Sequence, residues 1–156
     1  MTPTRVLIVD DVPQVRRELH TLLSLLDDID IVGEAENGQS AIELAAALQP
    51  NAILIDVEMP IVDGLEATRR IKQASPATRI IILSIHNEAA VRAQARLAGA
   101  DDFVDKGAPL TALLQAIHNI SATPQPSLRG AHPERSAAKS KGSDEAISLI
   151  EDKADV

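Results

Sequence analysis

A doubly wound α/β fold, in which a parallel sheet lies between two layers of helices, is predicted by two observations. Short runs of branched aliphatic residues alternate with helical segments five times between Arg5 and Ile120. The runs are almost wholly apolar, which is typical of parallel strands that are covered on both faces. The connections are short, so we expect each strand–helix–strand unit to cross over in the right-handed sense.

The five predicted strands are recognised by their apolar runs. They cover residues 6–9, 31–36, 52–55, 79–83 and about 102–104. The simplest arrangement of such strands is the flavodoxin-like order 2-1-3-4-5, a five-stranded parallel sheet in a (βα)5 domain. In this order the first and third strands are neighbours at the switch point, where open α/β sheets bind their ligands.

Each predicted strand is followed by a segment with apolar residues at helical spacing. The first helix is expected to begin near Pro13 and to last about 14 residues. The second and third end before Pro50 and Pro76. The fourth covers about residues 88–97, with Asn87 as its N-cap and Gly99 at its end.

The last helix and the segment beyond it differ sharply in composition. The fifth helix has Pro109 in its first turn and an apolar face up to Ile120. Residues 122–156 are polar and rich in Ser, Ala, Lys and Pro, which is typical of a flexible segment. Apolar residues at 146, 147 and 150 leave open a short terminal docking helix, although a solvated tail is the more common case. We therefore expect a folded domain over residues 1–121 and a flexible polar tail over residues 122–156.

The composition argues against several classes of function. The chain has 156 residues, no cysteine and a net charge of -8. Without cysteine there can be no disulfide and no thiolate chemistry. An acidic chain without a basic cluster is a poor nucleic-acid surface, and no run approaches the ~20 apolar residues that span a bilayer. We expect a cytoplasmic protein without direct nucleic-acid or membrane partners.

Polar residues follow four of the predicted strands at the point where each strand ends. They are Asp10 and Asp11 after the first strand, Asp56 after the third, Ser84 after the fourth and Lys106 after the fifth. Because the carboxyl ends of parallel strands lie along one edge of a sheet, we expect these side chains to converge. Three adjacent carboxylates repel one another unless a cation such as Mg²⁺ joins them. Asp56 is then placed to attack a phosphoryl group, with Lys106 and Ser84 holding its oxygens.

Together these motifs resemble the receiver domain of response regulators in bacterial two-component signalling, over about Arg5 to Ile120. The matching segments are Val9-Asp10-Asp11, Asp56-Val57-Glu58-Met59-Pro60, Asp63-Gly64, Ser84, Gly99-Ala100-Asp101 and Phe103 to Lys106. The resemblance implies that Asp56 is the phosphoacceptor. It also implies that Asp10, Asp11, Asp56 and the carbonyl of Glu58 hold Mg²⁺.

The same resemblance implies roles for residues around the acidic cluster. Lys106 would bind the phosphoryl group, and Ser84 and Phe103 would form the conformational switch. Phe103 is the sole aromatic residue of the chain, and ordinary core packing is the alternative interpretation of it. Glu58 and His86 would tune the lifetime of the phosphorylated state.

Ser84-Ile85-His86 and Gly107 look like the luminescence- and nitrate-type subtype of receivers. Members of that subtype usually carry a helix-turn-helix domain, and we expect the segment after Ile120 to be too short and too polar to form one. The resemblance therefore implies a phosphorelay protein rather than an enzyme. Such a protein catalyses only its own phosphorylation and dephosphorylation. A histidine kinase or histidine phosphotransfer protein would donate the phosphoryl group, and an unknown downstream protein would receive the signal.

Two other functions are left open by the sequence. An aspartate-nucleophile phosphatase usually has Asp-x-Asp after its first strand, and Asp10-Asp11-Val12 lacks the second carboxylate at that spacing. A transcription regulator could act through its tail, through a DNA-binding partner or through dimerisation. Homodimer formation on phosphorylation is compatible with the receiver interpretation as well.

Overall fold

The computed structural model describes residues 2–119, which form five strands alternating with five helices. The elements are β1 (Thr4–Val9), α1 (Pro13–Ser24), β2 (Ile29–Ala35), α2 (Gly38–Leu48), β3 (Ala52–Ile55), α3 (Gly64–Ala74), β4 (Arg79–Ser84), α4 (Ala89–Ala98), β5 (Asp102–Asp105) and α5 (Leu110–His118). All strand pairs are parallel, in the order β2-β1-β3-β4-β5. The predicted fold class and strand order are confirmed. The predicted tail and its terminal helix lie outside the described residues.

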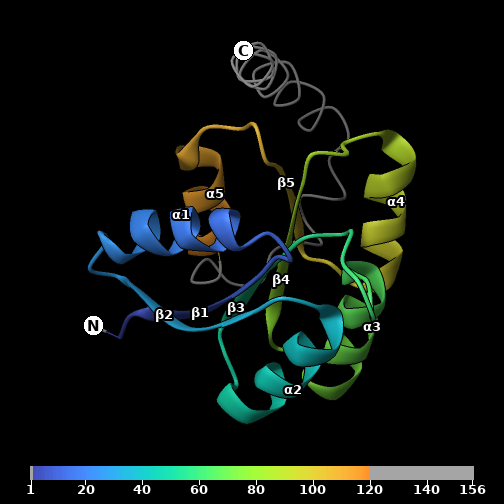
Figure 1. Ribbon diagram of the computed structural model, residues 1–156, viewed down its shortest axis with the longest axis horizontal. Helices are drawn as coiled ribbons and strands as arrows, with labels where there is room; N and C mark the ends of the chain where they lie inside the picture. Colours follow the sequence, from blue (N-terminus) through green and yellow to red (C-terminus); the bar gives the residue numbers. More distant parts are fainter. Residues whose placement is uncertain (1, 120–156) are drawn as a thin grey trace.

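Helices cover both faces of the sheet, so each face has its own apolar core. Figure 1 shows α1 and α5 on one face and α2, α3 and α4 on the other. Alternate residues of β1 separate accordingly: Val6 and Ile8 pack on the α1–α5 side, whereas Leu7 and Val9 pack on the other. The central strands are therefore buried on both sides, which explains their lack of polar alternation. Within residues 2–119 no helix combines the length and the apolar character needed to cross a membrane.

The register of the sheet aligns the ends of its central strands. Val9 of β1 pairs with Ile55 of β3, and Ile55 pairs with Ile82 of β4. The ladder continues one residue further, because the Asp56 N–H donates to the carbonyl of Val9 at 3.1 Å. Asp10, Asp56 and Ser84 therefore emerge at the same edge of the sheet.

The start of α4 differs from the prediction that Asn87 is its N-cap. The N-cap is Glu88, which makes no side-chain capping hydrogen bond. Asn87 lies one residue earlier, and its Nδ2 donates to Oδ2 of buried Asp105 at 2.7 Å. A buried carboxylate needs such a donor more than an exposed helix end does, because water can satisfy the latter.

Smaller differences concern the ends of other elements. The first helix has 12 residues rather than about 14, and β2 begins at Ile29, two residues before the predicted start. Pro109 is the N-cap of α5 and thus precedes its first turn. Such shifts leave the order and the faces of the elements unchanged.

Candidate functional site

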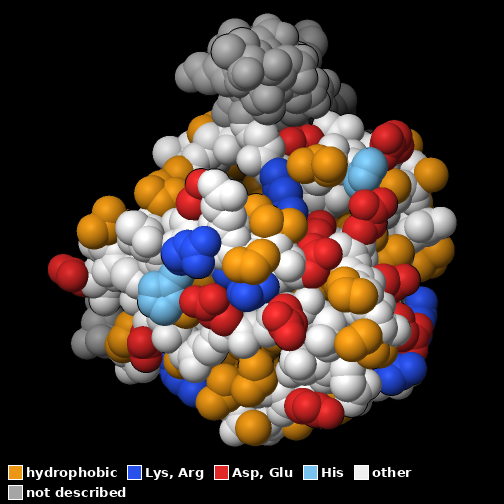
Figure 2. Space-filling model, in the orientation of Figure 1, with side chains coloured by type: hydrophobic (Ala, Val, Ile, Leu, Met, Phe, Trp, Pro, Cys, Tyr) orange, Lys and Arg blue, Asp and Glu red, His pale blue; other side chains and the backbone are white. Residues whose placement is uncertain are grey.

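An acidic cluster lies where β1 and β3 end. One carboxylate oxygen from each of Asp10, Asp11 and Asp56 lies within 4.8 Å of the other two. Asp10 and Asp56 are only 2% and 8% exposed, whereas Asp11 faces solvent. Figure 2 shows acidic side chains gathered near the middle of this face of the molecule. The structure thus brings together the three carboxylates that the sequence places at strand ends.

Lys106 supplies a positive charge to this cluster. Its Nζ lies 2.8 Å from Asp10 Oδ2 and 3.6 Å from Asp56 Oδ2. The backbone of Lys106 is held beside β4, because its N–H donates to the carbonyl of Ser84 at 2.9 Å. One ammonium among three carboxylates leaves the cluster with an excess of negative charge, which favours a further cation.

The environment of Asp56 makes ionisation of this carboxyl harder than usual. Burial raises the pKa of Asp56 above its ordinary value of 3.8, the ammonium of Lys106 opposes that rise, and the charges of Asp10 and Asp11 add to it. The N–H of Val57 donates to Asp56 Oδ1 at 2.9 Å. Oδ1 is thus tied to the backbone, and Oδ2 is the oxygen near Lys106.

The cluster fits a hard divalent cation. Its donors are carboxylate oxygens, and the carbonyl of Glu58 follows two residues after Asp56 in the same loop. Mg²⁺ prefers such oxygen ligands and retains several waters, which the exposed side of Asp11 would admit. Asp10, Asp11 and Asp56 are therefore the residues that would hold Mg²⁺, and the Glu58 carbonyl as a further ligand stays a prediction.

Ser84 ends β4 beside the acidic cluster. It is 1% exposed, and its Oγ accepts a hydrogen bond from the N–H of His86 at 3.0 Å. Because the hydroxyl accepts here, its own proton remains able to donate to a ligand. This geometry is compatible with the predicted switch hydroxyl.

Glu58 and His86 contact each other although they belong to different loops. His86 Nε2 lies 3.3 Å from Glu58 Oε2, which joins the loop after β3 to the loop after β4. Both side chains are substantially solvent-exposed. Both residues are predicted from the sequence to tune the phosphorylated state, but their contact is not. The contact arises because β3 and β4 are neighbours in the sheet, which brings the loops that follow them together.

Phe103 lies on β5, away from the acidic cluster. Its half-buried ring packs against the core on the α2–α3–α4 side of the sheet. The guanidinium carbon of Arg92 stands 4.6 Å from the ring centroid, which is a cation–π contact with α4. In this structure the ring is part of the packing between β5 and α4, and its switch role stays a prediction.

Gly64 is needed for the close packing of α3 against the phosphoacceptor candidate. A Cβ at this position would lie 1.9 Å from the carbonyl oxygen of Asp56. The preceding Asp63 is the N-cap of α3, and its Oδ1 accepts from the N–H of Glu66 at 2.9 Å. The Asp63-Gly64 motif thus starts the helix and lets it approach Asp56 closely.

Asp101, another motif residue, has a structural position. Its Oδ2 accepts from Lys72 Nζ at 2.8 Å and from the N–H of Ile80 at 2.9 Å. Gly99, two residues earlier, ends α4 with a φ of 105°. These contacts connect the ends of α3 and α4 to β4 and lie outside the acidic cluster.

Arg16 contacts the site but is not among the residues predicted from the sequence. Its Nη1 donates to the backbone carbonyl of Asp10 at 2.6 Å. An arginine on a surface helix is ordinarily expected to lie on the solvent-exposed face. Its position within the first turns after Asp10 and Asp11 is the one signal that could have pointed to it.

Comparison with known proteins identifies the family to which the chain belongs. Residues 6–118 match the family model described as the response regulator receiver domain. The nitrate/nitrite response regulator protein NarL of Escherichia coli strain K12 is 39% identical over 122 residues, which are 77% of this chain and 56% of NarL. The chain thus spans about half the length of the curated relatives it matches.

Solved structures show the same fold. A two-component response regulator of the LuxR family from Aurantimonas sp. SI85-9A1 is 34% identical, with a TM-score of 0.74 over 78% of this chain and 86% of that chain. The response regulator domain of Thermotoga maritima CheB is also 34% identical, with a TM-score of 0.72 over 79% of this chain and 99% of that chain.

Proposed function

Because the chain belongs to the response regulator receiver domain family, we propose that it is a phosphorylation-controlled switch with Asp56 as its phosphoacceptor. The phosphoryl donor is a histidine kinase or a histidine phosphotransfer protein. The observation that carries the proposal is the placement of Asp56, buried among Asp10, Asp11 and the ammonium of Lys106. A receiver of this kind transmits a signal and does not turn over a separate substrate.

The geometry favours Asp56 Oδ2 as the attacking oxygen. Oδ1 is occupied by the N–H of Val57, whereas Oδ2 lies 3.6 Å from Lys106 Nζ. In the transfer, Oδ2 forms a bond to phosphorus while the phosphorus–nitrogen bond of the donor phosphohistidine breaks, and the imidazole keeps that electron pair. Mg²⁺, when bound, neutralises negative charge on the phosphoryl oxygens. Lys106 holds a further oxygen electrostatically.

We assign the switch to Ser84 and Phe103, with Lys106 as the residue that binds the phosphoryl group. A phosphoryl group adds about one to two negative charges and new acceptor oxygens at Asp56. The Ser84 hydroxyl can donate to them, and Lys106 can move its contact from Asp10 to the new group. Population then shifts towards a second conformation in which Phe103 and the β5–α4 packing differ. The output is contact with a downstream protein.

Glu58 and His86 are proposed to set how long the phosphoryl group remains. Their side chains meet across two loops that follow β3 and β4. From this position they can limit the approach of water to phosphorylated Asp56.

A cytoplasmic location stays a prediction, as do the boundary between residues 121 and 122 and a homodimer formed on phosphorylation.

The test is intact-protein mass spectrometry after incubation with Mg²⁺ and acetyl phosphate. The wild type should gain one phosphoryl group that is lost at alkaline pH, and Asp56→Asn should gain none. Asp30→Asn, an exposed position on β2, is the matched control and should behave like the wild type. An adduct on Asp56→Asn would refute the phosphoacceptor assignment. A wild type that takes no phosphoryl group from acetyl phosphate or from histidine kinases would refute the switch.

The alternative function, a transcription regulator that acts through dimerisation, uses the same phosphorylated switch but has a second copy of the chain as its partner. It predicts that phosphorylation increases self-association. Sedimentation velocity of the wild type with and without Mg²⁺ and acetyl phosphate measures this directly. A monomer under both conditions would leave contact with a different downstream protein as the output.

A further inference from the structure

Arg16 connects the first helix to the backbone of the acidic cluster. Its Nη1 donates to the carbonyl oxygen of Asp10 at 2.6 Å, and its Nε lies 3.4 Å from Glu34 Oε1 on β2. We propose that Arg16, held in place by Glu34, positions Asp10 and thereby sets the affinity of the acidic cluster for Mg²⁺. This inference rests on the proposed function, because it concerns the metal site of the receiver.

Asp10 is held through each of its polar groups. Its N–H donates to the carbonyl of Ala35 at 3.1 Å, and its Oδ1 accepts from the N–H of Val12 at 2.9 Å. Its Oδ2 accepts from Lys106 at 2.8 Å, and its carbonyl accepts from Arg16. The first two contacts restrain the chain on the β2 side and in the following turn. The bond from Arg16 fixes the peptide that joins Asp10 to Asp11, so it orients both predicted metal ligands.

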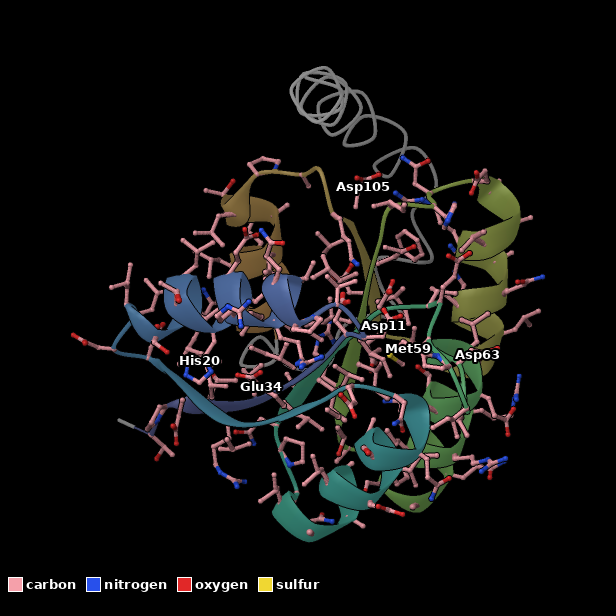
Figure 3. All side chains as sticks on the ribbon, viewed as in Figure 1. Asp11, His20, Glu34, Met59, Asp63 and Asp105 are labelled. Carbon is pink, nitrogen blue, oxygen red and sulfur yellow. The ribbon has the colours of Figure 1, made fainter. Side chains whose placement is uncertain are left out.

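Glu34 fixes the guanidinium from the opposite side. Its Oε1 faces Arg16, and its Oε2 lies 2.7 Å from Nδ1 of His20, one turn further along α1. Figure 3 shows His20 and Glu34 beside each other between α1 and β2. The side chain of Arg16 is only 16% exposed, so its planar head has little freedom to leave this position. Residues that orient metal ligands in this manner commonly affect metal affinity.

The sign of the effect separates positioning from simple charge. A guanidinium close to a cation site repels the cation, so its removal should strengthen Mg²⁺ binding if charge alone matters. If Arg16 acts by orienting Asp10 and Asp11, its removal should weaken Mg²⁺ binding instead. The two explanations therefore predict opposite changes in the dissociation constant.

The experiment is a calorimetric titration of the full chain with Mg²⁺ alone. We expect Arg16→Gln to weaken Mg²⁺ binding by about tenfold, and Glu34→Gln to weaken it in the same direction by a smaller factor. Arg17→Gln is the matched control, since it removes the same charge from an exposed neighbouring position on α1. Its affinity should stay within about twofold of the wild type, because surface charges are screened. The rate of phosphorylation by acetyl phosphate should return towards that of the wild type when Mg²⁺ saturates Arg16→Gln.

Unchanged or tighter Mg²⁺ binding by a folded Arg16→Gln variant would overturn the inference. Thermal melts establish that the variant is folded. If Arg16→Gln does not fold, Glu34→Gln decides, and unchanged affinity in that variant would overturn the inference equally. A wild type that binds no Mg²⁺ and accepts no phosphoryl group would overturn the proposed function as well. A wild type that does both while Arg16→Gln binds Mg²⁺ normally would refute only the role of Arg16.

Discussion

The ammonium of Lys106 lies 2.8 Å from Asp10 Oδ2, although 96 positions separate the two residues in the sequence. The contact crosses the sheet from the end of β5 to the end of β1. It is a partly buried ion pair in a cluster that holds more carboxylates than cations. Removing one partner of such a pair leaves a buried charge without compensation.

Replacement of Lys106 by glutamine should therefore destabilise the domain at neutral pH. We expect a loss of about 2 kcal/mol at pH 7, because the clustered carboxylates then repel one another without a cation. The loss should shrink at pH 4, because burial raises the pKa of Asp56 above 3.8 and protonation of this carboxyl removes one of the repelling charges. Urea unfolding at both pH values measures the difference. Arg17→Gln, which removes a positive charge from an exposed position on α1, is the control and should lack this pH dependence below pH 7; equal behaviour of the two variants would contradict the prediction.

Asp56→Asn should stabilise the protein while abolishing its phosphorylation. Burial raises the pKa of Asp56 above 3.8, so the folded state binds this proton more tightly than the unfolded state does. Stability therefore falls as pH rises through 3.8 towards the raised pKa, and it stays lowered above both values. The asparagine variant lacks this penalty and should be more stable by about 1 kcal/mol at pH 7.

The gain from Asp56→Asn should vanish below pH 3.8, because Asp56 is then neutral in both states. Urea unfolding at pH 7 and pH 3 measures this, with Asp30→Asn as the exposed control that shows no such gain. A variant less stable than the wild type at pH 7 would mean that the carboxylate of Asp56 is a net structural contributor. The predicted result fits the general pattern in which a functional charge is kept at some cost in stability.

Much of this site could be predicted from the sequence because strand ends are easy to locate. An apolar run that stops at Asp56 or Ser84 predicts both where the strand lies in the sequence and which polar residue lies at the carboxyl edge of the sheet. The parallel topology then brings residues from distant segments together without knowledge of any side-chain contact. For the same reason the sequence predicts that Asp10, Asp56 and Lys106 lie together, as the structure shows.

Contacts made by long side chains could not be predicted in this way. Arg16 contacts both the carbonyl of Asp10 and the carboxylate of Glu34 on β2, and the second contact depends on how the sheet is ordered. Asn87 is not the N-cap of α4, because its side chain donates to buried Asp105 instead. Which partner a long polar side chain contacts depends on which polar groups are buried, and the burial of each group depends on the complete fold.

Gly64→Ala should damage both stability and phosphorylation. The added methyl group would lie 1.9 Å from the Asp56 carbonyl oxygen and 2.9 Å from Val57 Cα, so backbone must move. We expect a loss of about 2–3 kcal/mol, together with slower phosphorylation by acetyl phosphate. Gly33→Ala is the control, since its nearest neighbour is a side-chain methyl of Leu48 at 3.0 Å, which can shift. Equal losses in the two variants, measured by urea unfolding, would show that the contact with Asp56 is not special.

Ile61→Gly should stabilise the loop that follows Asp56. Ile61 has a φ of 70° and a side chain that is largely solvent-exposed, at 78% for the residue. The N–H of Val62 donates to the carbonyl of Pro60 at 2.8 Å, so Ile61 is the central residue of a strained γ-turn. A β-branched residue in this region is costly and glycine is not. We expect a gain of about 1 kcal/mol in the free energy of unfolding, because relief of the strain exceeds the entropy cost of glycine.

Ile85→Gly tests whether that gain comes from the backbone. Ile85 is likewise an exposed isoleucine, 67% exposed in the loop after β4, but it is not among the described residues with positive φ. Glycine there relieves no strain and only increases the freedom of the unfolded chain, so stability should fall by about 0.5–1 kcal/mol. Urea unfolding should thus give changes of opposite sign for the two variants. Changes of the same sign would mean that loss of exposed apolar surface, rather than backbone conformation, determines the effect at Ile61.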